Sequence, residues 1–400
     1  MEPIWKKAVG EYIFDEKGRK YLDFTSGVMV ANIGHANKVV VKEIQKIVES
    51  NLLYCYRYPV RAKQKFRKYL LDFVDGEYSQ VCFAATGAEA IENSMMIASR
   101  YWESLGNKDG FFVSFSNAYH GKTLGASLLS DIKRYKSNIL EAPCSNLVKK
   151  VNFPTNKNEE IETITKLTSI KKGCIGIYIE CIQGSTLLKA SNSFLKELRK
   201  FATKNKILLI VDEIQTGFYR TGPKFSYYKS GIKPDMICVG KGLTASLPLS
   251  LVLLVRKLTN FTSEGLDAST HSSNPLSIAA SIGALKVYKS KAFRINLKES
   301  VDGYASMMKN ISNAVLSKVD TIHPGGVFGG LKFNLNPDQN YKINNFVYEC
   351  RRKGLFLPLA VGQNSNIVKF TPPLTIKKTQ LKFAEQVIIQ TLRTLQLTGI

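Results

Sequence analysis

ILLIVDEIQTGFYRTG (residues 207–222) and PDMICVGKGL (residues 234–243) decide the fold of this chain. Each contains a short apolar run, ILLIV or MICV, of the kind that forms a strand buried on both faces of a sheet. A chemically active side chain follows each run, Asp212 in the first segment and Lys241 in the second. Because open α/β sheets bind ligands at the carboxyl ends of their strands, the two segments predict a parallel sheet with a site at that edge.

Lys241 and Asp212 together favour one chemistry. A lysine amine can hold an aldehyde cofactor as a Schiff base, and a carboxylate can keep the ring nitrogen of that cofactor protonated. Gly240 and Gly242 flank the lysine and let the backbone approach a bulky ligand. These features predict a site for pyridoxal 5′-phosphate (PLP). The alternative is that Lys241 is an ordinary solvated loop lysine, since lysines are abundant in the chain.

The rest of the sequence alternates apolar strands with amphipathic helices from about residue 59 onward. This alternation predicts an α/β fold with a mainly parallel central sheet and helices on both faces. Beyond about residue 290 the pattern changes to helices and shorter strands, with Gly and Pro clustered in HPGGVFGG (323–330). We therefore expect a large cofactor-binding domain over 51–290, a smaller α+β domain over 291–400, and an N-terminal segment, 1–50, that contributes to the smaller domain.

Composition argues against several classes of protein. The chain has 400 residues, and its longest apolar run, LPLSLVLLV (247–255), is about half the length that spans a bilayer. The charged N-terminus has no apolar signal core, and the seven scattered cysteines form no CxxC pair, so we expect a reducing, cytoplasmic location. Four dispersed histidines predict no metal site. The net charge is +24, but the basic residues are spread along the chain, which favours anionic metabolites over nucleic acid as partners.

Three further strand ends carry candidate cofactor-binding residues. Gly87 and Ala88 stand in TGAEAIEN (86–93) at the start of a predicted helix, whose free N–H groups can bind a phosphate. Tyr119 and His120 follow another strand, where an aromatic ring can stack on the cofactor. Glu180 ends the strand CIGIYIE, and a carboxylate there is costly unless it is paired or functional. Each feature also has an ordinary structural explanation, such as a helix cap or a core aromatic.

Two weaker candidates complete the set. Gln215, three residues beyond Asp212, can donate a hydrogen bond to the phenolic oxygen of the cofactor. Thr270, in the loop THSSNPL (270–276), offers a hydroxyl suited to a phosphate oxygen.

In this order, the motifs resemble the class III aminotransferases of the ornithine, acetylornithine and 4-aminobutyrate type, which are fold type I PLP enzymes. The motifs that carry the resemblance are TGAEAIEN, YHGKTLGA, ECIQG, VDEIQTGFYRTG, GKGL and THSSNPL. The N-terminal segment and KFTPPLTI near the C-terminus extend it over almost the whole chain. It implies an enzyme that moves an amino group from an amine or ω-amino acid to a keto acid.

The resemblance also assigns roles to individual residues. It implies Lys241 as the Schiff-base lysine, Asp212 on the pyridine nitrogen and Gln215 near the ring oxygen. It places Gly87 and Ala88 on the phosphate and Tyr119 against the ring. Thr270 is expected to reach the phosphate of a neighbouring subunit's cofactor, which implies a homodimer.

Two positions depart from the family pattern at the expected substrate site. Where family members that use glutamate commonly carry a carboxylate-binding arginine, this chain has Lys369, in VKFTPPL. A lysine supplies charge but lacks the planar fork that fits a carboxylate. Where those members usually have a glutamate that screens the arginine, this chain has Ser185. Arg57, in YCYRYP (54–59), is a candidate substitute anion clamp or an ordinary surface arginine.

These departures leave other functions open. The nearest is an epimerase, aminomutase or decarboxylase with the same fold and cofactor. A PLP-binding protein without turnover is a further alternative, against which Lys241 and Asp212 argue because both are present.

Overall fold

The computed structural model of the chain describes residues 2–56, 58–75, 78–132, 142–262, 269–315, 318–359 and 366–397. The chain forms two compact units. Unit 1 comprises Met1–Lys42, Phe218–Lys224 and Lys286–Ile400, and unit 2 comprises Glu43–Gly217 and Phe225–Leu285. The sequence analysis placed the boundaries at residues 50 and 290 and did not anticipate the short insertion Phe218–Lys224 into unit 1.

Unit 2 is built on a seven-stranded sheet of order β4-β10-β9-β8-β7-β5-β6. The strands are β4 (Gln80–Ala84), β5 (Phe111–Phe115), β6 (Val148–Val151), β7 (Cys174–Ile179), β8 (Leu208–Asp212), β9 (Met236–Val239) and β10 (Ser250–Leu254). All run in one direction except β10, which is antiparallel to both β4 and β9. A reversal is expected there, because residues 240–249 are too short to contain the crossover that parallel neighbours require.

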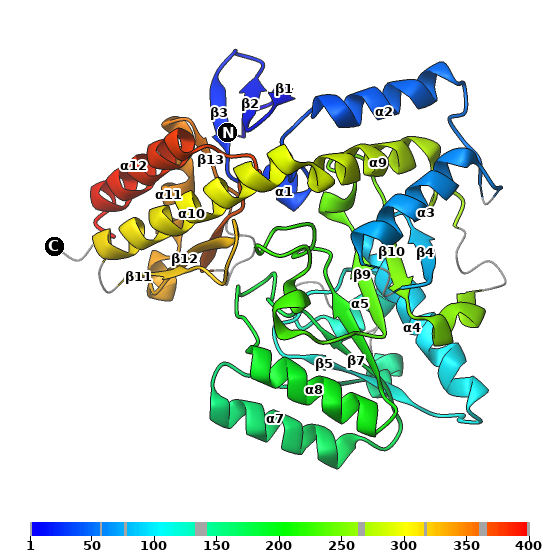
Figure 1. Cartoon of the computed structure of the whole chain (residues 1–400). Helices are drawn as coiled ribbons and strands as arrows, with labels where there is room; N and C mark the ends of the chain where they lie inside the picture. The colour runs from blue at the N-terminus through cyan, green and yellow to red at the C-terminus, as the bar shows by residue number, and fades with distance from the viewer. Residues whose placement is uncertain are drawn as a thin grey trace. The chain divides into compact units, whose positions relative to one another are not determined.

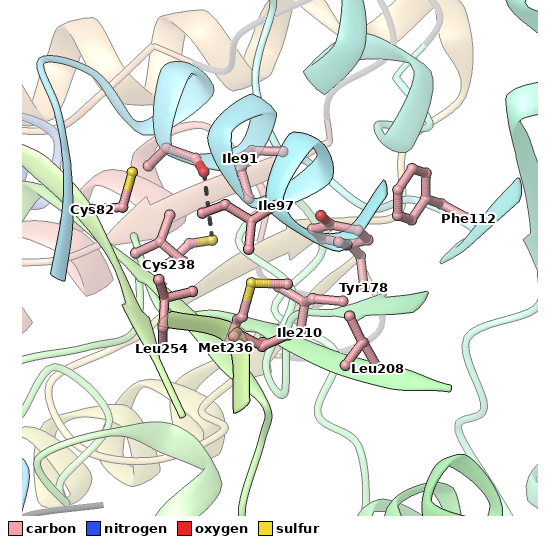
Figure 2. Close-up of a cluster of buried hydrophobic side chains, with 14 of the residues drawn as sticks. Cys82, Ile91, Ile97, Phe112, Tyr178, Leu208, Ile210, Met236, Cys238 and Leu254 are labelled. Atoms are coloured by element: carbon pink, nitrogen blue, oxygen red, sulfur yellow. Dashed lines mark hydrogen bonds between the residues drawn. The ribbon is translucent and has the colours of Figure 1, made fainter. Parts of the chain in front are cut away.

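Helices cover both faces of this sheet, as the sequence predicted (Figure 1). Those of unit 2 are α3 (Arg61–Phe73), α4 (Gly87–Ser104), α5 (Leu124–Leu129), α7 (Lys157–Ile170) and α8 (Asn192–Lys204). Helix α4 packs on one face, where Ile91 and Ile97 meet Ile210 and Cys238 in a cluster of buried side chains (Figure 2). The other face carries α8, whose Phe194 meets a β5 side chain.

Unit 1 contains two small sheets, of order β1-β2-β3-β13 and β11-β12-β14. Their strands are β1 (Trp5–Val9), β2 (Tyr12–Asp15), β3 (Lys20–Asp23), β13 (Leu355–Phe356), β11 (Val319–Ile322), β12 (Gly329–Phe333) and β14 (Ile367–Phe370). The principal helices are α10 (Lys291–Ala314), α11 (Tyr341–Arg352) and α12 (Lys378–Thr394), with α12 packed against the other two (Figure 1). Three further helices are α1 (Ser26–Met29) in unit 1, and α2 (Lys38–Glu49) and α9 (Pro275–Lys289), which both cross a unit boundary.

Arg220 anchors the inserted segment within unit 1. It is fully buried, and its Nη1 donates to the carbonyl oxygens of Val327 at 2.9 Å and Pro372 at 2.7 Å. Its Nη2 donates to Asn32 Oδ1 at 2.6 Å. Burial lowers the pKa of Arg220 to about 10. These hydrogen bonds explain why a segment so close in sequence to Asp212 belongs to the other unit.

In the part of the chain that the structure describes, no helix combines the length and apolar character needed to cross a membrane.

Candidate active site

The site residues predicted for unit 2 gather at one edge of the seven-stranded sheet, since strands that run in parallel end at the same edge. Each follows or ends a different strand: Gly87 follows β4, Tyr119 and His120 follow β5, Glu180 follows β7, Asp212 ends β8 and Lys241 follows β9. The topology therefore brings together residues from five separate parts of the sequence.

Asp212 and His120 form a buried pair. His120 Nδ1 lies 2.8 Å from Asp212 Oδ2, and the two side chains are 0% and 4% exposed. Asp212 Oδ1 accepts a hydrogen bond from the backbone N–H of Ile214 at 2.9 Å. Both contacts stabilise the ionised carboxylate when Nδ1 carries the imidazole proton. His120 Nε2 is buried and has no hydrogen-bond partner within the described residues, so the pair is incomplete without a further group.

Lys241 lies in a constrained stretch of backbone. Its φ of 45° is in the left-handed region, which is uncommon for a residue other than glycine. The preceding Gly240 packs against Ser250 so closely that a side chain would collide there. Burial lowers the pKa of the Lys241 amine, and the carboxylates of Asp212 and Glu180 partly oppose that effect. A lysine with a lowered pKa is a better nucleophile and general base near neutral pH.

Glu180 is the second buried carboxylate of this edge, with 4% of its surface exposed. Its Oε2 accepts from the backbone N–H of Tyr119 and its Oε1 from that of Gly184, both at 2.9 Å. Burial is the main cause that raises the pKa of Glu180, to about 7; His120 opposes this rise and Asp212 adds to it. The four ionisable side chains of the edge therefore influence one another.

The N-terminus of α4 supplies backbone N–H donors. Thr86 caps the helix, with its hydroxyl accepting from the N–H of Glu89 at 3.2 Å. A Cβ at Gly87 would lie 3.0 Å from Ile214 Cδ1, so a larger residue here would require the Ile214 side chain to shift. The first-turn N–H groups of an α-helix have no intrahelical partner, and those of Gly87 and Ala88 suit a phosphate.

Gln215 and Tyr119 also lie at this edge, and both are half-buried. The amide of Gln215 packs against Gly184, where any side chain would collide with it. Ser185, half-buried as well, donates its hydroxyl to the carbonyl oxygen of Asn117. The side chain of Ser185 therefore contacts the turn that contains Asn117, in the same unit.

Three other predicted residues are not part of this cluster as described. Thr270 is exposed, in a loop whose Asn274 side chain donates to the carbonyl oxygen of Leu53 at 3.2 Å. Lys369 belongs to unit 1, on β14, where it pairs with Gly330 of β12. Arg57 lies outside the described residues.

The sequence analysis missed two side chains that support the cluster. Ser130 Oγ accepts from the backbone N–H of His120 at 2.9 Å, and Gln183 Nε2 donates to the carbonyl oxygen of Ser116 at 2.6 Å. Gln183 stands inside the motif ECIQG, so its place in a site segment was visible in the sequence. For Ser130 the sequence offers no comparable indication, because the contact depends on how residues 117–130 fold back.

The residues present fit PLP. The carboxylate of Asp212 suits a protonated ring nitrogen, the amine of Lys241 suits an aldehyde, and the start of α4 suits a phosphate. The unpartnered His120 Nε2 is a feature expected where a ligand completes a site. Among the residues described, no group of three or more His, Cys, Asp or Glu side chains could hold a metal ion.

Comparison with known families agrees with this geometry. The family model described as "Aminotransferase class-III" matches residues 1–392. The chain belongs to the class III aminotransferase family. This aminotransferase is therefore an enzyme, and its cofactor is PLP. The resemblance stated from the sequence motifs is confirmed.

Curated relatives match this aminotransferase over nearly its whole length. The acetylornithine aminotransferase of Aquifex aeolicus is 29% identical over 386 residues, covering 95% of this chain and 94% of that protein. The acetylornithine aminotransferase of Oceanobacillus iheyensis is 30% identical over 385 residues, covering 96% and 91%.

Solved structures share the fold of the aminotransferase. The ornithine aminotransferase of Toxoplasma gondii has a TM-score of 0.88 at 21% identity, covering 99% of this chain and 91% of that chain. The taurine:2-oxoglutarate aminotransferase of Bifidobacterium kashiwanohense, solved with PLP and glutamate, has a TM-score of 0.87 at 22% identity, covering 98% and 93%. The predicted α/β fold of the fold type I PLP enzymes is confirmed.

Proposed function

We propose that this aminotransferase works at the sheet edge described above, with Lys241 as the residue that holds PLP and Asp212 as the partner of its ring nitrogen. One observation carries the proposal. Lys241 and Asp212 stand at the carboxyl ends of two neighbouring parallel strands, β9 and β8, and the carboxylate of Asp212 lies 2.8 Å from the buried His120.

Each remaining residue of the edge has a role that its position supports. PLP supplies an aldehyde carbon that binds amines and a ring that accepts electrons. The N–H groups of Gly87 and Ala88 would bind its phosphate, and Tyr119 would contact its ring. Gln215 donates a hydrogen bond to the phenolic oxygen.

Lys241 also moves the proton. Once an amino donor has replaced it, its Nζ is a free amine in a site whose burial lowers the pKa of that amine. Nζ removes the proton from the substrate carbon that bears the nitrogen, acting as a general base, and later acts as the acid. Asp212 would pair with the protonated ring nitrogen, with its carboxylate held in place by His120 and by the N–H of Ile214.

The proposed donor is an amine or ω-amino acid of the ornithine, acetylornithine or 4-aminobutyrate type, and the acceptor is a keto acid. Relatives named acetylornithine aminotransferase over the full length support this substrate class. Lys369 replaces the arginine expected at the carboxylate clamp, and Arg57 is the candidate second anion contact. We propose a weaker preference for glutamate as partner than a bidentate arginine provides.

Assembly and location are proposed on the same basis. We propose a homodimer in which Thr270 contacts the phosphate at the neighbouring subunit's site. The exposed position of Thr270 is compatible with that contact. A cytoplasmic location is proposed from the scattered cysteines.

An absorbance titration tests the function. The PLP-loaded protein is mixed with ornithine, acetylornithine, 4-aminobutyrate and amines that lack a carboxylate. We expect a true donor to remove the visible band of the lysine-bound cofactor, to raise the band of its amine form, and to leave an oxo product. Lys241→Ala should remove the visible band and all measurable turnover, whereas Lys233→Ala, which alters an exposed lysine just before β9, should not.

The outcomes separate the alternatives. Near-normal turnover in Lys241→Ala would overturn the assignment. Substrate chemistry without an oxo product, with the visible band returning, would identify an epimerase, aminomutase or decarboxylase instead.

A further inference from the structure

Glu180 joins two turns that reach the cofactor edge from different strands. Its two carboxylate oxygens accept from the N–H of Tyr119, after β5, and from the N–H of Gly184, after β7. Each oxygen serves one turn at 2.9 Å. The side chain therefore acts as a bridge between main-chain segments and is not free to turn toward a ligand.

The same motif makes two more bonds to the same turn. Gln183 Nε2 donates to the carbonyl oxygen of Ser116 at 2.6 Å, and the Ser185 hydroxyl donates to that of Asn117. With Glu180 these contacts attach residues 180–185 to residues 116–119 at three points. Tyr119 is thereby positioned from outside its own strand.

A role in folding alone explains the bridge poorly. Two main-chain donors can be satisfied by a neutral side chain, whereas a buried carboxylate carries a desolvation cost. The charged and titratable groups around Glu180 include His120, Asp212, Lys241 and the buried thiol of Cys181. Above about pH 7, where its carboxyl is mostly ionised, its charge opposes the effect of burial on the pKa of the Lys241 amine, so it acts on the reactive nitrogen as well as on the turn.

We propose that Glu180 is a positioning residue, whose carboxylate fixes the turn that carries Tyr119 and presents a negative charge toward the nitrogen of Lys241. Ser185 supports the same turn, although the family pattern places a substrate-screening glutamate at that position. The inference rests on the proposed function, because it requires Lys241 to hold the cofactor.

The test is a pH titration of the holoenzyme without substrate. The visible absorbance band of the lysine-bound cofactor reports whether the nitrogen that Lys241 contributes is protonated. The circular dichroism of the same band reports the orientation of the cofactor ring in the site. In Glu180→Gln we expect the midpoint of the band to move down by about one pH unit, because a negative charge that favours the protonated nitrogen is lost. We also expect the circular dichroism of the band to change.

Glu213→Gln is the matched control. Glu213 is also fully buried, and its pKa is also raised to about 7 by burial. Its carboxylate accepts from Thr216 Oγ1 at 2.5 Å and Ser226 Oγ at 2.6 Å. We expect this variant to keep the midpoint and the circular dichroism of the wild type. If the changes in Glu180→Gln came only from the loss of a buried carboxylate, Glu213→Gln would show them too.

Glu180→Asp decides the result if Glu180→Gln does not yield holoenzyme. The shorter side chain keeps the charge but cannot reach both N–H groups, so the midpoint should stay while the circular dichroism changes. Two results would overturn the inference about Glu180 and leave the proposed function intact. One is an unchanged midpoint and circular dichroism in Glu180→Gln. The other is the same shift of the midpoint in Glu213→Gln. If the wild type shows no visible band, the assignment of Lys241 falls, and the inference falls with it.

Discussion

Asp212 and Glu213 are adjacent in the sequence, yet they belong to two buried polar clusters of different character. Asp212 is paired with His120, whose Nε2 has no partner among the described residues. Glu213 accepts hydrogen bonds from the hydroxyls of Thr216 and Ser226 and from the N–H of Tyr227. The first cluster leaves a buried nitrogen without a hydrogen-bond partner in the described part of the chain and is incomplete, whereas the carboxylate of the second has three donors within the protein and is complete.

The difference separates a ligand site from a fold-stabilising site. Buried polar groups in native proteins are nearly always hydrogen-bonded, so the orphan Nε2 of His120, among the ionisable side chains that follow the strands, fits a place where a ligand supplies the partner. The Glu213 cluster needs no such partner. Neighbours in an extended chain point to opposite sides, which allows one strand end to serve both purposes.

Asp212→Asn gives the largest expected effect. The amide removes the charge that holds the cofactor ring nitrogen protonated, so we expect turnover to fall by about a thousandfold. The cofactor-free protein should be no less heat-stable than the wild type, because an incomplete charged site is a poor source of stability. Steady-state kinetics and thermal unfolding of the apoprotein measure the two quantities. Turnover within a few-fold of wild type would break the proposed distinction between the clusters.

His120→Asn sharpens the comparison with a smaller loss. The Asn amide can still donate to Asp212, but it cannot reproduce the position of the imidazole or its Nε2. We expect turnover to fall by about tenfold and PLP to be released more readily. Activity measurements and cofactor dissociation followed by absorbance provide the check. A loss clearly larger than that of Asp212→Asn would mean that His120 acts directly on the reaction and not only through Asp212.

Sequence patterns predicted the main sheet well because burial on both faces imposes a continuous apolar run. ILLIV (207–211) and MICV (236–239) correspond closely to β8 and β9. The direction of β10 was not predicted, since its apolar run reads the same either way. The transfer of Phe218–Lys224 to unit 1 was also missed, because the contacts of Arg220 are all distant in sequence.

The candidate site was predictable to the extent that it follows the strand ends. The rule that ligands bind at carboxyl ends selected Asp212, Lys241 and Glu180 before any contact was known. The pairing of His120 with Asp212 and the support from Ser130 were not predictable, because they depend on the folded path of distant segments. The roles proposed for the residues at the expected substrate site, including Lys369, stay predictions.

Glu213→Gln gives the smallest expected effect on turnover and tests the complete cluster through pH. Burial raises the pKa of Glu213 to about 7 from 4.5, so the folded state binds more protons than the unfolded state between these values. The stability due to that proton is fully present below pH 4.5 and is lost as the pH rises through about 7. By pH 8 the wild type should have lost about 3 kcal/mol of unfolding free energy through this group, relative to pH values below 4.5.

In Glu213→Gln the unfolding free energy should fall less as the pH rises, because the contribution of Glu213 is absent. The contribution of Glu180, whose pKa is also about 7, should remain. Urea unfolding at pH 5.5 and pH 8 measures the difference. If the wild type and the variant decline by the same amount, Glu213 does not take up a proton on folding. Its cluster would then hold a buried negative charge on three hydrogen bonds alone. In that case a full set of hydrogen bonds would not imply a neutral carboxyl at Glu213, and this property alone would not separate its cluster from that of Asp212.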